Sequence, residues 1–325
     1  MRALVTGGTG FIGSHLVEAL IKKGLSVRCL VRDPARLGWL EGLDVELARG
    51  DCTEPDTLRG VAGGVDCIFH AAGITKAARA GDYYVVNGEG TRYLAEAAAK
   101  EPGPLRKFVY VSSQAASGPS WEGRPRREED PPEPVSDYGR SKLLGERYLS
   151  RFKEAFDVVL VRPTSVYGPR DRDVYTFFKV VSRGIRVAFR ERRLVSLCYV
   201  DDLVEGILRS AFGETVSGEA FFMAWPEPCD WDTMGEAIAS ALGVRARRVV
   251  LPIPMLSAVA LLAEGAAALT GRPALLNRQK MAEIRRRYWV VDVKKARERL
   301  GFEAVRDFRA GAGLTADWYR RVGWL

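Results

Sequence analysis

The amino-acid sequence predicts an α/β protein, in which a doubly wound parallel sheet is followed by a smaller, mostly helical C-terminal lobe. Short apolar runs alternate with helical periodicity in the first half of the chain, as in βαβ units. The first run turns into a helix through three glycines, and the alternation weakens in the second half. A chain of 325 residues is long enough for two units, which we place at 1–165 and 166–325, intertwined.

The first predicted strand, Ala3 to Thr6, passes through Gly7, Gly10 and Gly13 into a helix from Phe11 to Lys22. This turn leaves bare N–H groups at the positive end of the helix dipole, where a pyrophosphate can bind. Glycine lets the backbone approach the phosphates closely. A ligand-free turn is the alternative, but the strand before it and the helix after it favour a dinucleotide and a Rossmann fold.

The second predicted strand, Val27 to Val31, ends in Arg32-Asp33. A dinucleotide fold places at this point either a carboxylate for the ribose hydroxyls or an arginine for a 2′-phosphate. Arg32 comes first, with Arg36 one turn later, so the sequence predicts NADP. Asp33 keeps NAD as the alternative.

The remaining strands of the predicted sheet end in small or polar residues before a helical run, and ligands of such a sheet bind at these carboxyl ends. His70 ends one strand, but its neighbours are Phe69 and alanines, so we interpret it as a packed structural histidine. The elements predicted after the second strand are strands at 45–48, 65–70, 107–111 and 158–161, helices at 87–99 and 138–152, and a proline-rich loop at 119–136.

The second half of the chain is predicted to cover the carboxyl end of the sheet. Its predicted elements are helices at 174–183, 202–211, 231–242, 255–270, 293–300 and 308–319, and short strands near 195–200 and 219–224. Residues 249–276 are mostly apolar. The helix within them is too short, and carries Glu264, so it is not expected to span a membrane. Its length favours a buried helix, and the alternative is an apolar lid or interfacial helix for a lipid-like substrate.

Tyr138 and Lys142 are four residues apart on one predicted helix and point the same way. Free tyrosine titrates at about 10, and an adjacent ammonium together with an oxidised nicotinamide would lower that pKa. Ser113 ends the strand at 107–111, at the same edge of the sheet, and could hydrogen-bond the reacting oxygen. We therefore predict Ser113, Tyr138 and Lys142 as catalytic residues.

The net charge of +8 is concentrated in arginine runs at 190–193, 245–248 and 285–287. These runs lack interleaved aromatic residues, so we interpret them as solvated faces and expect no nucleic-acid partner. Attraction to an anionic membrane surface stays open.

Cysteine and histidine usage disfavours other classes of site. The five cysteines are scattered and never form a Cys-x-x-Cys pair, which indicates reduced thiols in a cytoplasmic protein. His15 and His70 are the only histidines, so we expect neither a metal site nor a Ser-His-Asp triad. The first strand begins at about the second residue, and no targeting peptide is expected before it.

These motifs together resemble the extended short-chain dehydrogenase/reductases, the NAD-dependent epimerase/dehydratase superfamily. The matching segments, in family order, are 6–13, 50–52, 70–73, 87–91, 112–113, 138–142, 162–169, 199–203 and 295–302. The resemblance implies that Tyr138 is the acid/base, that Lys142 holds the nicotinamide ribose and tunes Tyr138, and that Ser113 orients the substrate oxygen.

The resemblance also implies where the cofactor binds. The residues implied are Gly7, Gly10, Phe11, Ile12 and Gly13 at the diphosphate, Asp51 and Cys52 beside adenine, Ala71, Ala72, Gly73 and Asn87 along the cofactor path, and Pro163, Ser165 and Val166 near the nicotinamide.

Nucleotide-sugar epimerases of this superfamily commonly carry two arginines that clamp the diphosphate. The first should stand in 194–201, which is apolar where it is expected, and Met281 and Ala282 lie near the second position. Guanidinium forks suit diphosphates, so their absence weakens the sugar-nucleotide interpretation. The arrangement resembles the 3β-hydroxysteroid dehydrogenase-like and bacterial ceramide-reductase-like branches.

The leading hypothesis is an NAD(P)-dependent oxidoreductase that interconverts a ketone and a secondary alcohol on an apolar, lipid- or steroid-like small molecule. The alternative is a nucleotide-sugar 4-epimerase or dehydratase, in which the arginine runs at 190–193 or 285–287 would clamp the diphosphate. A catalytically idle dinucleotide-binding regulator is disfavoured by Ser113, Tyr138 and Lys142. We also expect a homodimer, in the cytoplasm or at the inner membrane surface.

Overall fold

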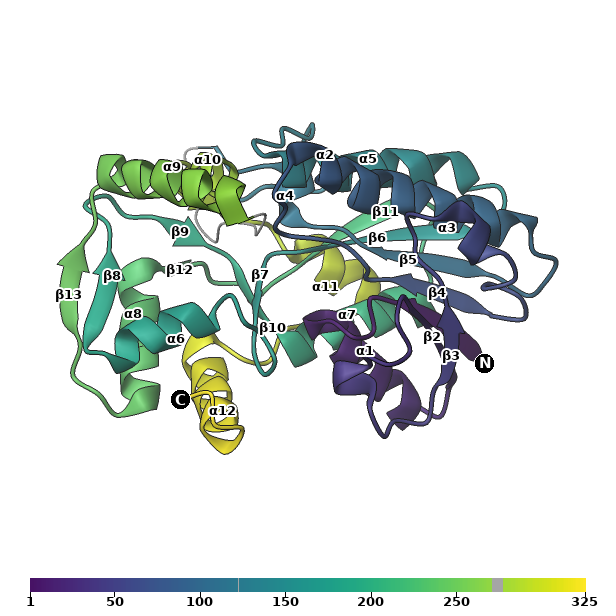
Figure 1. Ribbon diagram of the computed structural model, residues 1–325, viewed down its shortest axis with the longest axis horizontal. Helices are drawn as coiled ribbons and strands as arrows, with labels where there is room; N and C mark the ends of the chain where they lie inside the picture. Colours follow the sequence, from purple (N-terminus) through teal and green to yellow (C-terminus); the bar gives the residue numbers. More distant parts are fainter. Residues whose placement is uncertain (122, 271–276) are drawn as a thin grey trace.

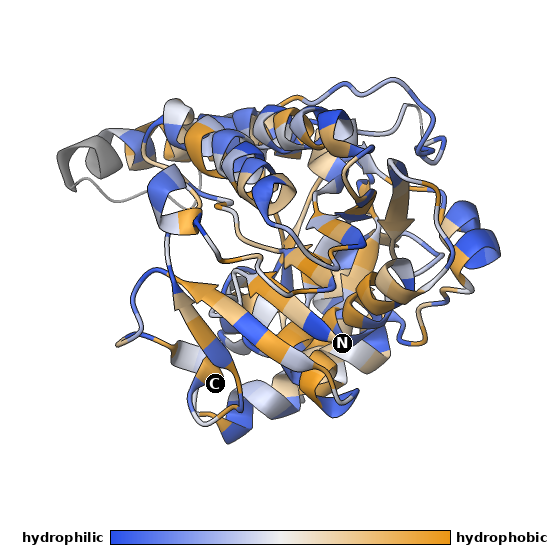
Figure 2. Ribbon diagram, turned by 90° about the vertical axis from the view of Figure 1, so that its right-hand side faces the viewer, coloured by the Kyte–Doolittle hydropathy of each residue, from blue (hydrophilic) through white to orange (hydrophobic). Residues whose placement is uncertain are grey.

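The computed structural model of the protein describes residues 1–121, 123–270 and 277–325, and their side chains except at 266–270. Its centre is a sheet of seven parallel strands in the order β11-β6-β5-β4-β1-β2-β3. The strands are β1 (Arg2–Thr6), β2 (Ser26–Val31), β3 (Glu46–Arg49), β4 (Cys67–His70), β5 (Lys107–Val111), β6 (Asp157–Pro163) and β11 (Glu219–Met223). Figure 2 shows them as mostly hydrophobic.

Helices cover both faces of this sheet (Figure 1). On one face lie α1 (Phe11–Lys22), α7 (Val200–Phe212) and α11 (Lys294–Leu300), whose apolar side chains share a core with the strands. On the other face lie α3 (Gly90–Lys100) and α5 (Asp137–Leu149). The strand order reverses between β1 and β4, where a doubly wound sheet opens its ligand crevice. The predicted α/β, Rossmann-type fold is confirmed.

The strand expected near 219–224 does not belong to the C-terminal lobe. It is β11, which pairs in parallel with β6 and extends the main sheet at its edge. Helix α7, just before it, packs against β5 and β6. The main sheet thus takes residues from both sides of position 165, and the domain boundary itself stays a prediction.

The C-terminal lobe holds short strands and helices around a second core, which includes Tyr167, Phe178, Ile238 and Tyr319. Its small sheets are β10-β7, β12-β9-β14 and β13-β8. Its strands are β7 (Ser165–Tyr167), β8 (Ile185–Ala188), β9 (Leu194–Val195), β10 (Leu197–Tyr199), β12 (Cys229–Asp230), β13 (Arg247–Val250) and β14 (Tyr288–Trp289). Its helices are α6 (Tyr175–Ser182), α8 (Trp231–Leu242), α9 (Ile253–Thr270), α10 (Arg278–Ile284) and α12 (Phe308–Arg321).

Two local features differ from the sequence prediction. The helix expected at 87–99 begins earlier, because α2 (Ala80–Tyr83) runs through a π-helical segment at 84–89 into α3. Strands β8 and β13 were not predicted. They pair only with each other, and all four β13 side chains are exposed, so neither shows the apolar alternation of a half-buried strand.

Helix α9 is not the buried helix that its length favoured. Leu262 is 75% exposed and Leu261 58%, whereas Ala260 is fully buried. The helix lies along the outer edge of the C-terminal lobe, between β13 and α10 (Figure 1), and packs against α10. Within the described ranges, no helix has the length and apolar character needed to cross a membrane.

Candidate active site

The glycine-rich turn after β1 is shaped by very close backbone contacts. A Cβ atom on Gly13 would lie 2.1 Å from the carbonyl oxygen of Gly7, and one on Gly7 would lie 2.7 Å from the backbone of Ala71 and Ala72. Gly7 also has a φ of 73°, which disfavours side chains. Only glycine lets the turn pass between α1 and the segment after β4.

The N-terminus of α1 is arranged for an anion. Its cap residue, Gly10, makes no side-chain capping hydrogen bond, and the first turn holds no acidic residue. The N–H groups of this turn, which includes Phe11, Ile12 and Gly13, therefore face the sheet edge with the positive end of the helix dipole. This cradle, which a Cβ would fill, fits the pyrophosphate of a dinucleotide.

A second group of predicted residues meets at the carboxyl end of β4. The Thr6 hydroxyl accepts a hydrogen bond from the Ala72 N–H (3.2 Å), and buried Asn87 accepts one from the Ile74 N–H (2.8 Å). A Cβ on Gly73 would lie 2.8 Å from Asn87 Oδ1 and 3.1 Å from Lys142 Nζ. The cofactor path predicted at Ala71, Ala72, Gly73 and Asn87 thus leads directly to the Lys142 ammonium.

His70, at the end of β4, is a structural residue, as predicted. It is fully buried, with Thr6 Oγ1 2.7 Å from Nδ1 and Thr91 Oγ1 3.0 Å from Nε2. Its ring stacks on Tyr110. Burial lowers the pKa of His70 to about 3, so the imidazole stays neutral and carries no charge toward the cofactor path.

The predicted adenine end lies at the carboxyl ends of β2 and β3. Arg32 is exposed, and its charge acts on the buried Cys52 thiol. The Asp33 carboxylate accepts a hydrogen bond from the Ala35 N–H (3.0 Å) and so caps its own turn. Asp51 is held similarly by the N–H and hydroxyl of Thr53. Arg32 and Asp33 directly follow β2. Within the described part of the chain, Asp33 accepts a hydrogen bond, whereas the Arg32 guanidinium makes no hydrogen bond or ion pair.

Helix α5 carries Tyr138 and Lys142 to the same edge. Lys142 is 4% exposed, and its ammonium donates to the Val111 carbonyl (2.9 Å) at the end of β5. Burial lowers the pKa of Lys142 to about 8, while Glu146 acts in the opposite direction. Burial raises the pKa of Tyr138 to about 12, and a hydrogen bond with the Ser113 side chain acts to lower it. Ser113 and Tyr138 are therefore brought together, with Lys142 one turn further along α5, but in the protein alone burial outweighs any activation of the phenol.

Sequence reasoning missed the support beneath these residues. Glu146 lies one further turn along α5 and accepts a hydrogen bond from Ser112 Oγ (2.5 Å). It also accepts two from Arg162, at Nε (2.9 Å) and Nη2 (2.7 Å), with both side chains less than a tenth exposed. The four-residue spacing of 138, 142 and 146 was the available signal. This pair ties α5 to β6 and to the residue before Ser113.

Helix α10 closes over the start of α5. Ser136 Oγ donates to Glu283 (2.8 Å), and the Asp137 N–H donates to Gln279 Oε1 (2.8 Å). The Tyr83 ring meets the Tyr138 ring edge-on, at 6.2 Å between centroids. None of these contacts was predicted: α10 of the C-terminal lobe holds the residues just before Tyr138, and Tyr83 of α2 packs against its ring.

The residues predicted near the nicotinamide stand at the crossing into the lobe. Pro163 ends β6, and Ser165 and Val166 form β7 with β10 as partner. Ser165 is exposed at this point.

Within the described residues, no hydrogen bond or ion pair joins the arginine runs at 190–193 and 285–287 to the predicted site residues. Arg193 is 7% exposed, and its Nη1 donates to the carbonyls of Ile284 (2.5 Å) and Arg286 (3.3 Å). Arg287 stacks on Tyr288 and faces Glu191 (3.3 Å). Arg190 and Arg192 are exposed around a surface hollow of about 210 Å³.

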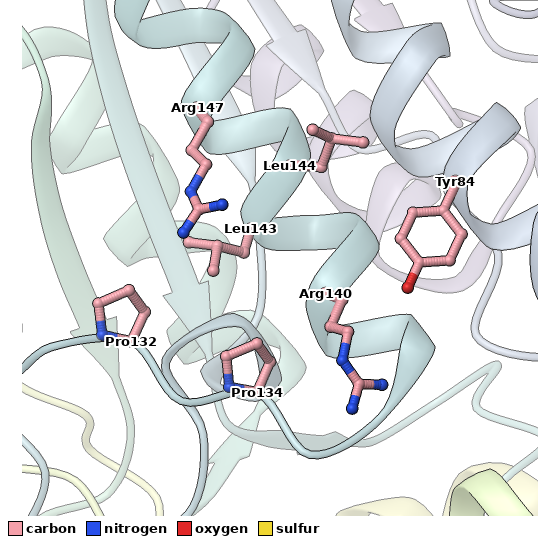
Figure 3. A pocket seen from close by; sticks show the side chains of 7 residues that line it. All are labelled: Tyr84, Pro132, Pro134, Arg140, Leu143, Leu144 and Arg147. Carbon is pink, nitrogen blue, oxygen red and sulfur yellow. The ribbon is translucent and has the colours of Figure 1, made fainter.

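A larger surface hollow, of about 400 Å³, lies beside α5 (Figure 3). Its lining residues are Tyr84, Pro132, Pro134, Arg140, Leu143, Leu144 and Arg147. None of the predicted site residues lines it. Across the described residues, no group of histidine, cysteine and acidic side chains is placed to hold a metal ion.

Comparison with known proteins identifies the family of the chain. Residues 3–221 match the NAD dependent epimerase/dehydratase family. The chain belongs to this family. Its resemblance to the extended short-chain dehydrogenase/reductases is thereby confirmed, and it is an NAD-dependent enzyme by family.

Relatives of this epimerase/dehydratase protein include oxidoreductases of apolar molecules. A ceramide reductase of Caulobacter vibrioides is 29% identical over 323 residues, covering 99% of this chain and 95% of the relative. A 3 beta-hydroxysteroid dehydrogenase/Delta 5-->4-isomerase of Mycobacterium tuberculosis is 29% identical over 270 residues, covering 75% of this chain and 70% of the relative. The solved UDP-glucose 4-epimerase of Thermotoga maritima has a TM-score of 0.82 at 23% identity, covering 99% of both chains, and shares the fold.

The buried pair beneath the site predicts a large effect on stability. Glu146→Gln leaves the Arg162 charge buried without its partner, which we expect to lower the free energy of unfolding by about 3 kcal/mol or more in urea denaturation. The matched control is Asp56→Asn, which breaks the exposed Asp56–Arg59 pair. That change should cost less than about 1 kcal/mol. Equal effects of the two substitutions would contradict a supporting role for Glu146.

Proposed function

We propose that this protein is an NADP(H)-dependent oxidoreductase that interconverts a ketone and a secondary alcohol on an apolar small molecule. The observation that carries the proposal is the meeting of the α1 N-terminus, the Asn87–Gly73 path and the Ser113–Tyr138–Lys142 group at one edge of the sheet. A cofactor bound along this path would end beside Lys142. A nicotinamide supplies or accepts the hydride, and the protein positions the carbonyl and moves the proton.

Tyr138 is the proposed proton donor and acceptor. With a pKa of about 12 it is protonated near neutral pH, so in the reducing direction its hydroxyl donates to the substrate oxygen. Ser113, already hydrogen-bonded to Tyr138, orients that oxygen. Lys142, with a pKa of about 8, is mostly cationic at neutral pH and can stabilise the phenolate that remains.

The cofactor contacts are proposed in chain order along the crevice. Gly7, Gly10, Phe11, Ile12 and Gly13 would hold the diphosphate, Asp51 and Cys52 the adenine, and Arg32 the 2′-phosphate. Ala71, Ala72, Gly73 and Asn87 would line the path to the ribose at Tyr138 and Lys142, with Pro163, Ser165 and Val166 at the nicotinamide. Both Arg32 and Asp33 are exposed, but the Asp33 carboxylate caps its own turn while no contact of the Arg32 guanidinium is found within the described residues, which supports NADP over NAD.

The placement of the arginines supports an apolar substrate over a sugar nucleotide. A diphosphate stripped of water without charged partners is costly to bind, and Arg193 is already committed to two backbone carbonyls. The relatives named for ceramide and steroid chemistry agree with this choice. A nucleotide-sugar 4-epimerase is the second candidate, because the solved epimerase shares the whole fold. A homodimer and a cytoplasmic location stay predictions from the sequence.

Replacing the Tyr138 hydroxyl should abolish proton transfer without disturbing the cofactor. We expect Tyr138→Phe to reduce kcat by roughly 10²–10⁴-fold, with an unchanged Kd for NADPH, measured by fluorescence titration. The control is Tyr148→Phe, on the same helix, whose hydroxyl faces Glu89 instead. Turnover of Tyr138→Phe near that of the control would remove Tyr138 from the mechanism.

Cofactor preference should depend on Arg32. Losing a guanidinium that binds phosphate should weaken NADPH by about ten- to a hundredfold and leave NADH unchanged, measured as Kd for Arg32→Ala. Arg59→Ala, at an arginine side chain that is 84% exposed and paired with Asp56, serves as control. Equal dissociation constants for NADPH and NADH in the unmodified protein would contradict the proposed preference for NADP.

The substrate class can be decided by calorimetry and absorbance together. We expect no binding of UDP or UDP-sugars to the cofactor-loaded protein, and net NADPH oxidation with a hydrophobic ketone. Micromolar binding of UDP that is abolished by Arg190→Ala or Arg192→Ala would instead support the nucleotide-sugar 4-epimerase.

A further inference from the structure

Helix α9 presents an uncharged apolar face to solvent. Met255, Val259 and Leu262 follow at helical spacing on one side, and they are 47%, 47% and 75% exposed. Leu261 flanks them at 58%. The one charged residue in the described side chains of the helix, Glu264, is paired with Arg278 (2.6 Å). Side chains of this size on an unbroken face mark a binding surface.

The charge of the chain is concentrated around this helix. Residues 243–290 contain nine arginines and lysines and two glutamates, a net charge of +7 against +8 for the whole chain. Both glutamates are neutralised, Glu264 by Arg278 and Glu283 by Lys280 (3.1 Å). Four exposed arginines form no ion pair within the described residues: Arg245, Arg247, Arg285 and Arg286. Arg285 lies against α9, with Nη2 3.3 Å from Ser257 Oγ.

We propose that the exposed face of α9 docks on an anionic phospholipid bilayer. A helix with apolar side chains outward and arginines at its border suits the interface, where the side chains enter the acyl boundary and the guanidinium groups meet lipid phosphates. The charge decides against a second copy of the chain, because a symmetric contact would bring the unpaired arginines of two copies together, even though Arg248 and Arg287 are paired with Asp232 and Glu191. Binding requires no turnover, so this inference goes beyond the proposed reaction.

Docking at α9 would set the catalytic helix close to the lipid. Helix α9 packs on α10, and α10 is hydrogen-bonded through Gln279 and Glu283 to Asp137 and Ser136, the residues just before Tyr138. A single helix layer thus separates the docking face from the start of α5. An apolar molecule dissolved in the bilayer would meet the site from this side.

Vesicle sedimentation of the full chain tests the proposal. We expect binding to vesicles of phosphatidylcholine with phosphatidylglycerol, and little binding to phosphatidylcholine alone. The double variant Leu261→Ser/Leu262→Ser should bind roughly tenfold more weakly for each leucine. Arg285→Ser/Arg286→Ser should lose roughly fivefold for each arginine at low salt.

Matched controls use α12, on another part of the surface. Leu314 is 49% exposed, and Leu314→Ser should bind vesicles as the unmodified protein does. Arg321→Ser, at an exposed arginine near the end of α12, controls for charge. Each variant is scored only if its thermal unfolding and NADPH affinity match those of the unmodified protein, which separates a docking defect from a failed cofactor site.

Two results would overturn the proposal. One is an unmodified protein that stays in the supernatant with anionic vesicles, or control variants that weaken sedimentation as much as the α9 variants do. The other is light scattering in which Leu261→Ser/Leu262→Ser turns a dimer into a monomer, because the face would then be an interface between copies.

Discussion

The site depends first on a backbone contact that leaves no room for a side chain. Gly13 approaches the Gly7 carbonyl so closely that a Cβ would sit 2.1 Å from the oxygen. This contact sets the direction of α1, and with it the place where bare N–H groups meet the sheet edge. Gly7 in turn touches the segment after β4, so the same turn fixes Ala71 and Ala72. The proposed cofactor path and the anion cradle are therefore in direct contact.

The catalytic group shows a balance of opposing electrostatic effects. Burial raises the pKa of Tyr138 to about 12 and lowers that of Lys142 to about 8, which moves apart two values that are nearly equal in the free side chains. Glu146 lies buried beside Lys142 and acts to keep it charged. Arg162 balances Glu146 in turn, so the network beneath the site carries little net charge. The protein thereby holds a cation at the end of β5 and a neutral phenol one turn earlier on the same helix, as the proposed proton transfer requires.

The sequence predicted those features of the fold and of the candidate site that depend on residues close together in the chain. The glycine turn, the strand ends and the spacing of Tyr138 and Lys142 are short-range features, and the fold follows from their alternation. The pairing of β11 with β6 joins residues about 60 positions apart in the chain. The apolar run Ala-Phe-Phe-Met alone does not tell whether the strand belongs to the main sheet or to a small sheet of the C-terminal lobe. The contact of Glu146 with Arg162 likewise requires α5 to lie on β6. An apolar composition could not distinguish a buried α9 from an exposed one, because the neighbours of a helix decide its burial.

The proposed substrate class and the proposed membrane docking both depend on where the arginines near α10 lie. In a diphosphate site these residues would point inward to form forks. Here Arg193 holds the backbone around residues 284–286, which positions the segment leading from α10 into β14. Arg285 and Arg286, on that same segment, are exposed, and Arg285 contacts Ser257 of α9. The backbone that holds Arg193 thus also carries two exposed arginines. The burial of Arg193 and the basic neighbours of the exposed apolar helix are consequences of one arrangement of this segment.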